Sequence, residues 1–373
     1  MSGARHSAVA MGLAAILLVG AAAGCGGSGM ISPGVSRSPI AGGTGLSSTR
    51  FAEIDSKADG EALLASVHGG TVIRQLLPAM RSGRKLSGLA RIGPDSLVAT
   101  YNREAECTSD VNGCGPKPDT CGAEIVRLDI ATGKVTTLAR FGTDKQVYSA
   151  TPNPAHSELA MLVAPCVPAY FNAHVDVLRL ADHKTWSIGA TLPRCHGLFS
   201  PTWVDHGKKL LMAYGPARKP YVPKEGADGS CPTWHHLGLI EVPSQSGQPR
   251  LDGRLHRPPP HCSYDSLAAQ GAAIYAVTSC STRYEPSPMR LHRLDASLRS
   301  VKSWYVGQCE DGDSLAIDRA GRVLLGAYLF CNPPQRGHRL KDPVSVLDEL
   351  AGGKLRRVAK GGGGNLDFDG LAW

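Results

Sequence analysis

The chain has 373 residues, of which 42% are hydrophobic and 19% are charged, and its formal net charge is +8. This length allows a large buried core. The basic residues are scattered rather than gathered in a long run, so we expect a solvated surface and no nucleic-acid partner.

Residues 1–24 have the pattern of a signal peptide. A short basic start precedes residues 8–24, an unbroken run of apolar and small residues that ends in Ala-Ala-Gly. Cys25 follows directly and resembles the lipobox cysteine of bacterial, actinobacterial-looking lipoproteins, which is diacylated and becomes the new N-terminus. The sequence departs from that motif at Ala22, where leucine is more frequent. Plain secretion and a retained transmembrane helix are the alternatives, but no basic flank follows the run, which argues against a retained helix.

The next segment, residues 25–49, begins with Cys25 and continues with Gly, Ser, Pro and Thr and almost no large apolar residues. Such a stretch buries too little surface to offset its ordering entropy, so we expect a flexible tether. Residues 50–373 then form the folded domain, with no second hydrophobic span. The chain is thus expected on the extracytoplasmic side of the cell membrane, held by its lipid.

The cysteines agree with export. Eleven are present, and lipidation of Cys25 leaves an even ten. No close C-x-x-C pair occurs, and Cys107, Cys114 and Cys121 are spaced by sevens, which fits no common zinc module. The sequence therefore predicts disulfides.

The folded domain contains a repeat of short apolar strands separated by turn residues, as in all-β proteins. Each repeat begins with a small-residue strand that carries a serine, followed by a tight turn and a second apolar strand. The serines are Ser87, Ser149, Ser200, Ser266 and Ser314. A related segment, Gly370–Trp373, ends the chain with no strands behind it, whereas residues 61–67 and 71–77 offer strands near the start. The two ends are therefore predicted to complete one sheet together.

This repeat resembles the TolB-like six-bladed β-propellers over most of residues 50–373. The resemblance implies an all-β propeller of six blades, each with four strands, closed by N- and C-terminal strands. A seven-bladed propeller is the main alternative fold, followed by a pair of β-sandwiches.

Cys166, Cys280 and Cys331 each lie just after a second strand, and Cys195, Cys262 and Cys309 each lie four or five residues before the serine of the next repeat. Three pairs with nearly equal separations predict the disulfides Cys166–Cys195, Cys231–Cys262 and Cys280–Cys309. The sequence leaves open the pairing of Cys107, Cys114, Cys121 and Cys331.

The same repeat predicts where a partner binds. Turns on one face are short, whereas the cysteine-bearing face carries long insertions, the usual seat of binding on a rigid scaffold. We expect an envelope protein, peptide or glycan to bind there without catalysis. The candidate binding residues are Tyr170, Phe171, His196, Tyr221, Trp234, His235 and Tyr284.

Several carboxylates precede or enter the innermost strands and offer an alternative function. Oxygen ligands that converge on a channel mouth hold Ca²⁺ well, and six-bladed lactonase-type propellers use a central metal. The alternative is therefore a metal-dependent hydrolase or lactonase, although Asp is also common in turns for backbone reasons. The candidate ligands are Asp265, Asp311, Asp313, Asp367 and Asp369. Under the binding hypothesis we expect no cofactor.

Overall fold

The computed structural model describes residues 46–47, 49–55, 60–103, 107–110, 113–116, 121–165, 174–188, 197–215, 238–243, 256–259, 262–280, 288–308, 310–331, 339–360 and 371–373. The chain divides into two compact units, Met1–Gly43 and Thr44–Trp373, and all described residues belong to the second. Leu46 is buried in this unit and Ser47 forms a β-bridge with Arg50, so the folded domain begins slightly before residue 50. None of these residues forms a helix long and apolar enough to cross a membrane.

The described structure is almost entirely antiparallel β-sheet, and its one helical element is the 3-10 turn η1, Asp205–Gly207. Three sheets come from the first half of the chain: β1 (Arg50–Asp55), β2 (Glu61–Ser66) and β3 (Val72–Leu77); β4 (Met80–Arg81), β5 (Arg84–Gly93), β6 (Ser96–Arg103), β9 (Gly122–Asp129) and β10 (Val135–Arg140); and β11 (Lys145–Pro152), β12 (Glu158–Pro165), β13 (His174–Arg179) and β14 (Thr185–Ile188). A two-stranded ribbon, β7 (Cys107–Asp110) and β8 (Gly113–Pro116), lies between β6 and β9 in the sequence.

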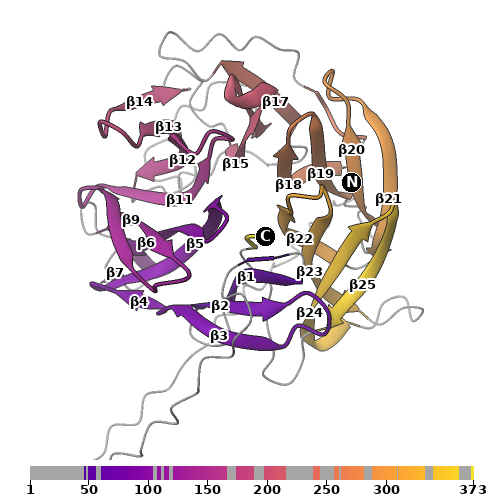
Figure 1. Cartoon of the computed structure of the whole chain (residues 1–373), viewed down its shortest axis with the longest axis horizontal. Helices are drawn as coiled ribbons and strands as arrows, with labels where there is room; N and C mark the ends of the chain where they lie inside the picture. The colour runs from indigo at the N-terminus through magenta and orange to yellow at the C-terminus, as the bar shows by residue number, and fades with distance from the viewer. Residues whose placement is uncertain are drawn as a thin grey trace, which may run out of the picture. The chain divides into compact units, whose positions relative to one another are not determined.

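The second half of the chain continues the pattern. Its sheets are β15 (Gly197–Val204), β16 (Lys209–Gly215) and β17 (Gly238–Pro243); β18 (Cys262–Gln270), β19 (Ala273–Cys280), β20 (Pro288–Leu294) and β21 (Ser300–Gln308); and β22 (Glu310–Ile317), β23 (Val323–Cys331), β24 (Arg339–Ala351) and β25 (Lys354–Lys360). The sheets surround a central axis, with the C-terminus near the centre (Figure 1). The predicted all-β propeller arrangement is confirmed.

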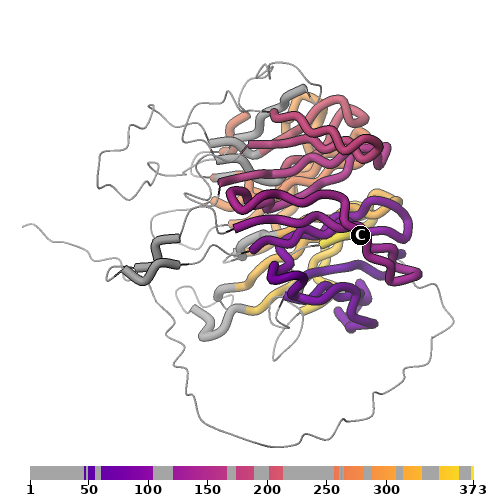
Figure 2. Tube along the Cα trace, turned by 90° about the vertical axis from the view of Figure 1, so that its left-hand side faces the viewer, coloured from indigo at the N-terminus to yellow at the C-terminus, as the bar shows by residue number. Residues whose placement is uncertain are grey.

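The hydrophobic core lies between neighbouring sheets rather than in one central mass. Val98 and Ile125 of one sheet pack with Val147 and Met161 of the next. The second strand of a sheet is therefore buried on both faces, which explains why β6 is buried at every position except its last, Arg103. The view turned by 90° shows the strands of neighbouring sheets side by side, with their ends at two opposite faces (Figure 2).

The C-terminus pairs with the N-terminal part of the domain, as predicted. Ala52 donates to the carbonyl of Ala372 at 2.9 Å and accepts from its N–H at 2.8 Å. The partner strand is β1, however, which the sequence did not reveal, and not either of the strands expected at 61–67 and 71–77. β1 pairs in turn with β2, so residues 371–373 extend the first sheet toward the axis.

The innermost strands β5, β11, β15, β18 and β22 share a β-bulge near the same place. The unpaired residues are Ser87, Tyr148, Ser200 with Pro201, Asp265 and Asp313. Ser149, Ser266 and Ser314 directly follow their bulges, whereas Ser87 and Ser200 lie within theirs. The repeat serines therefore do not occupy equivalent positions in β5 and β15, because a bulge adds a residue that spacing alone does not reveal.

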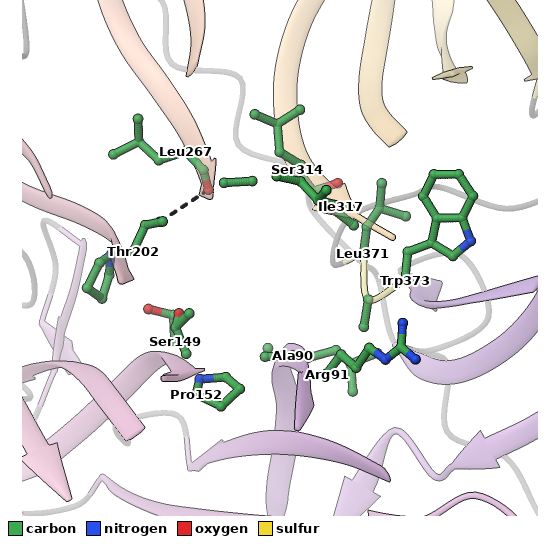
Figure 3. A pocket seen from close by; sticks show the side chains of 18 of the residues that line it. Ala90, Arg91, Ser149, Pro152, Thr202, Leu267, Ser314, Ile317, Leu371 and Trp373 are labelled. Atoms are coloured by element: carbon green, nitrogen blue, oxygen red, sulfur yellow. Dashed lines mark hydrogen bonds between the residues drawn. The ribbon is translucent and has the colours of Figure 1, made fainter. Parts of the chain in front are cut away.

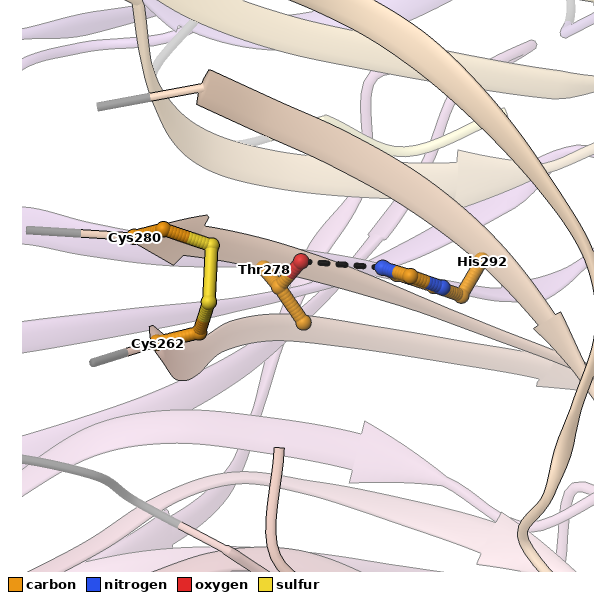
Figure 4. Close-up of a disulfide and its surroundings, with 4 residues drawn as sticks. All are labelled: Cys262, Thr278, Cys280 and His292. Atoms are coloured by element: carbon orange, nitrogen blue, oxygen red, sulfur yellow. Dashed lines mark hydrogen bonds between the residues drawn. A yellow bond between two sulfur atoms is a disulfide. The ribbon is translucent and has the colours of Figure 1, made fainter. Parts of the chain in front are cut away.

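The disulfide in the described residues joins Cys262 to Cys280 (Figure 4). The predicted pairs Cys231–Cys262 and Cys280–Cys309 are therefore wrong. Cys262 and Cys280 face each other directly in the β18–β19 pair, where cross-strand neighbours are already within bridging range, so no connection to the next sheet is needed.

The structure describes some of the other cysteines. Cys121 is also disulfide-bonded. Cys166, Cys195, Cys231 and Cys309 lie outside the described residues, and so does the predicted bond Cys166–Cys195.

Candidate functional site

A cavity of about 800 Å³ follows the central channel of the propeller. Its walls come from β5, β11, β15, β18 and β22, together with the C-terminal residues Leu371–Trp373. Ala90, Ser149, Thr202 and Leu267 surround the space from different strands (Figure 3). A volume of this size is in the range of sites for small molecules.

Hydrogen bonds between neighbouring sheets hold the channel wall. The side chain of Asn102, on β6, donates to the carbonyl of Val147 at 2.7 Å and accepts from its N–H at 2.9 Å. Asn102 also donates to the hydroxyl of Ser87 at 2.8 Å. This amide therefore locks the bulge of β5 against β11, and Thr202 makes a similar link by donating to the carbonyl of Leu267 at 3.3 Å. The wall is held by bonds that bridge sheets, which favours a pre-formed site.

The two ends of the channel differ. The innermost strands begin at the face that carries Cys262 and end at the face of the short turns, which we name the short-turn face. It includes Pro94-Asp95, residues 153–157 and residues 318–322. The cavity reaches this face, because Gly93, Asn153 and Gly271 line it.

Three basic side chains line the cavity at the short-turn face. Arg91 comes from the end of β5, His156 from the turn between β11 and β12, and Arg319 from the turn between β22 and β23. Each belongs to a different sheet. The guanidinium of Arg91 lies beside the channel, on the side of the C-terminal Trp373 (Figure 3).

These basic groups influence one another electrostatically. Burial and then the charge of Arg319 lower the pKa of Arg91, against smaller opposite effects of Asp95 and Asp318. Burial, followed by the charges of Arg91, Arg319 and Arg127, lowers the pKa of His156. The channel mouth is thus a region of positive potential.

The sequence-predicted site residues are mostly not placed. The binding candidates Tyr170, Phe171, His196, Tyr221, Trp234, His235 and Tyr284 lie outside the described residues, as do Asp367 and Asp369. Asp311 and Asp313 lie on β22, where the structure describes their backbone positions. Asp265 lies half-buried at the bulge of β18 and does not line the cavity. Among the described residues no three potential metal ligands gather.

No family model matches the chain, and no curated protein matches it significantly. Solved structures are similar in fold. A protein of unknown function from Bacteroides caccae is 10% identical with a TM-score of 0.50, over 87% of this chain and 98% of that one. An oligogalacturonate lyase from Vibrio parahaemolyticus is 9% identical with a TM-score of 0.46, over 84% and 80%. At such identities the likeness concerns the fold alone.

Prolyl endopeptidases are also among the similar structures. One is 10% identical with a TM-score of 0.41 over 83% of this chain, which spans 48% of the length of that enzyme. The activity named for each of these proteins is a property of that protein, and the similarity does not transfer it to this chain.

Sequence reasoning missed Arg91, His156 and Arg319 because they lie on the short-turn face, whereas binding was expected on the face with long insertions. A signal was present. Each residue follows a repeat serine by four to seven positions, at the end of the first strand or in the turn after it. Aligning the repeats for basic residues at that place, rather than for long insertions, selects these three together with His206, which follows Ser200 by six positions but does not line the cavity.

Proposed function

We propose that this chain is a lipid-anchored protein of the bacterial cell envelope whose propeller binds a ligand without catalysis. The observation that carries the proposal is the cavity of about 800 Å³ enclosed by the innermost strands. Its wall is held by hydrogen bonds between sheets, such as those of Asn102 with Val147, so the space is built into the scaffold.

The proposal includes a ring of six blades. Six hydrophobic clusters each combine residues of two neighbouring sheets. One of them joins the first sheet to the last, since Phe51 and Leu63 pack with Leu324 and Leu347. This packing supports a closed six-bladed ring, with residues 371–373 as the innermost strand of the first blade.

The end of the channel opposite the short-turn face is where we place selection of the partner, an envelope protein, peptide or glycan. The β7–β8 ribbon is an insertion between β6 and β9, after the end of β6 that lies away from the short turns. Insertions on a rigid scaffold suit recognition, because the sheets hold their ends in place.

Native mass spectrometry of the full chain, isolated from membranes, tests binding in the channel. Ala90 lines the cavity, and Ala90→Trp would fill part of it. Ala131→Trp, in the exposed turn after β9, is the matched control. We expect a bound mass with the wild type and with the control but not with Ala90→Trp. An unliganded wild type, or equal loading of all three proteins, would reject a channel ligand.

Membrane attachment has its own test. We expect Cys25→Ala to move the protein from the membrane fraction to the soluble fraction, because the acylated cysteine is lost. Continued membrane association of this variant would contradict the lipid anchor.

A metal-dependent hydrolase or lactonase is the second candidate. Asp265 and Asp313 occupy equivalent bulge positions on the innermost strands β18 and β22 of neighbouring sheets. Such residues suit a hard cation like Ca²⁺ when a third oxygen ligand joins them. Elemental analysis of the purified chain and of Asp265→Asn/Asp313→Asn would decide this. About one metal per chain, lost in the variant, would favour the enzyme, and a metal-free wild type would reject it.

A further inference from the structure

We infer that the short-turn mouth of the channel binds an oxyanion, the phosphate or carboxylate group of a ligand seated in the cavity, through Arg91, Arg319 and His156. The inference rests on the proposed binding function and names the chemistry of the ligand at that site. It also assigns a role to the short-turn face.

The first support is convergence. Three basic side chains from three separate sheets line one cavity at one end. They are far apart in the sequence, so local chain geometry does not bring them together. Guanidinium groups bind phosphate and carboxylate with paired N–H donors, and a protonated imidazole adds a further donor.

The second support is the balance of charge. Asp318 is the nearest acid in the turn of Arg319, but its carboxylate is already bound by Arg322 at 2.6 Å. It also accepts from the backbone N–H groups of Ala320 and Arg322, each at 2.9 Å. Asp95 contributes only part of the compensation at Arg91. In the part of the chain that the structure describes, neither Arg91 nor Arg319 forms an ion pair.

The third support is that hydrogen bonds hold the Arg91 side chain and the turns that carry His156 and Arg319 without neutralising the two arginine charges. Arg91 donates through Nε to the carbonyl of Gly93 at 2.8 Å, which fixes the side chain and leaves both terminal amino groups for a ligand. The turn of His156 is closed by its own N–H, which donates to the carbonyl of Asn153 at 2.9 Å.

The side chain of Asn153 also stabilises this turn by accepting from the N–H of Ser157 at 2.9 Å. His156 itself has a φ of 55°, a left-handed conformation that is uncommon for a residue with a side chain. The surrounding hydrogen bonds therefore maintain an unfavourable backbone geometry that presents this imidazole at the mouth. Asp318 stabilises the turn that carries Arg319 by accepting from the backbone N–H groups of Ala320 and Arg322.

An oxyanion at this mouth would offset the repulsion among the three basic groups. The cavity behind them supplies hydroxyl groups, including Ser266 and Ser314, and the apolar wall of Leu371. The ligand that fits places an anionic group at the short-turn face and the part of its structure next to that group inside the channel.

The test is isothermal titration calorimetry of the full chain in detergent at low ionic strength, with inorganic phosphate and with succinate as separate probes. Arg91→Gln and Arg319→Gln each remove one charge from the mouth. Arg299→Gln is the matched control, because Arg299 is exposed, pairs with Asp295 and does not line the cavity. Thermal unfolding checks that each variant is folded.

We expect at least one probe to bind and its dissociation constant to increase roughly tenfold or more in Arg91→Gln and in Arg319→Gln. Arg299→Gln should bind like the wild type. Binding of phosphate alone would identify a phosphate-bearing ligand, and binding of succinate alone a carboxylate-bearing one.

Two results would overturn the inference: no binding of either probe, or equal affinities in the mouth variants and in Arg299→Gln. The proposed function is tested separately. If the channel ligand detected by mass spectrometry remains while both probes fail, binding stands and the anionic ligand is rejected. If that ligand is also absent, both proposals fail.

Discussion

The indole N–H of Trp373, the last residue of the chain, donates a hydrogen bond of 2.8 Å to the carbonyl of Ser47. Its ring is 1% exposed and lies against the guanidinium of Arg322, 4.6 Å from the ring centroid. Trp373 therefore contacts both Ser47, near the beginning of the domain, and Arg322, in the turn between β22 and β23 of the last sheet.

Replacement of this side chain should weaken the whole domain. We expect Trp373→Ala to lower the free energy of unfolding by about 3–5 kcal/mol, because a large buried side chain is lost and a cavity remains. Urea unfolding followed by circular dichroism measures this. Tyr305→Ala is the control, since Tyr305 is 52% exposed, and it should change stability much less. Similar losses in the two variants would contradict a closing role for Trp373.

The Cys262–Cys280 bond leads to a direct chemical prediction. Digestion without reduction should release a peptide in which these two cysteines are joined. The double variant Cys262→Ala/Cys280→Ala should lose about 2–4 kcal/mol of stability, because the bond closes a loop in the unfolded chain. A peptide that joins Cys262 to Cys231 would instead restore the pairing expected from sequence spacing.

His292 should make stability depend on pH. It is buried between β19 and β21, where its ring nitrogens hydrogen-bond with Thr278 at 2.9 Å (Figure 4) and with Ser300 at 3.0 Å. Burial, and then the charge of Arg290, lowers its pKa. Because the unfolded chain takes up a proton near pH 6.5 and the folded chain only below that, stability should fall as the pH decreases below about 6.5.

The measurement is the free energy of unfolding at pH 7.5 and pH 5.0, for the wild type and for His292→Gln. The variant removes the contribution of His292, so its loss of stability between the two pH values should be smaller. An unchanged difference would show that His292 does not cause the effect. His183→Gln, at an exposed turn, serves as the control.

Anion binding should also depend on pH, through His156. Its pKa lies below the ordinary value, so the imidazole is neutral at pH 8 and gains charge as the pH falls below about 6.5. The probes also take up protons between pH 8 and pH 5.5, so the effect of His156 is the difference between proteins. The affinity of the wild type relative to His156→Gln should increase as the pH falls, whereas its affinity relative to His206→Gln, in the turn before β16, should stay constant. Identical pH profiles for the wild type and His156→Gln would exclude this imidazole from the site.

The repeated strands were predictable because each one combines a small-residue start with a turn and a second apolar strand. β1 was not, since Arg50–Asp55 directly follows a Gly/Ser-rich segment and has no turn signal before it. The disulfide prediction failed because two cysteines are plausible partners of Cys262: Cys280 in the same hairpin and Cys231 in an earlier segment. Sequence spacing does not distinguish between them. Only strand register does so, and it places Cys280 directly opposite.

The candidate site could not be predicted for a similar reason, because the sequence does not show how the strands are arranged. Arg91, His156 and Arg319 belong to separate repeats, and whether their side chains meet depends on the bulges and on ring closure. Local turn chemistry could be foreseen, as Asn153 and Asp318 are residue types that stabilise turns. The meeting of three turns at one channel mouth is a property of the tertiary fold.

The pairing of Ala52 with Ala372 has a consequence for biosynthesis. The first sheet to leave the ribosome lacks its innermost strand until residues 371–373 are made. The edge of β1 that pairs with Ala372 therefore stays unpaired while the intervening sheets are synthesised.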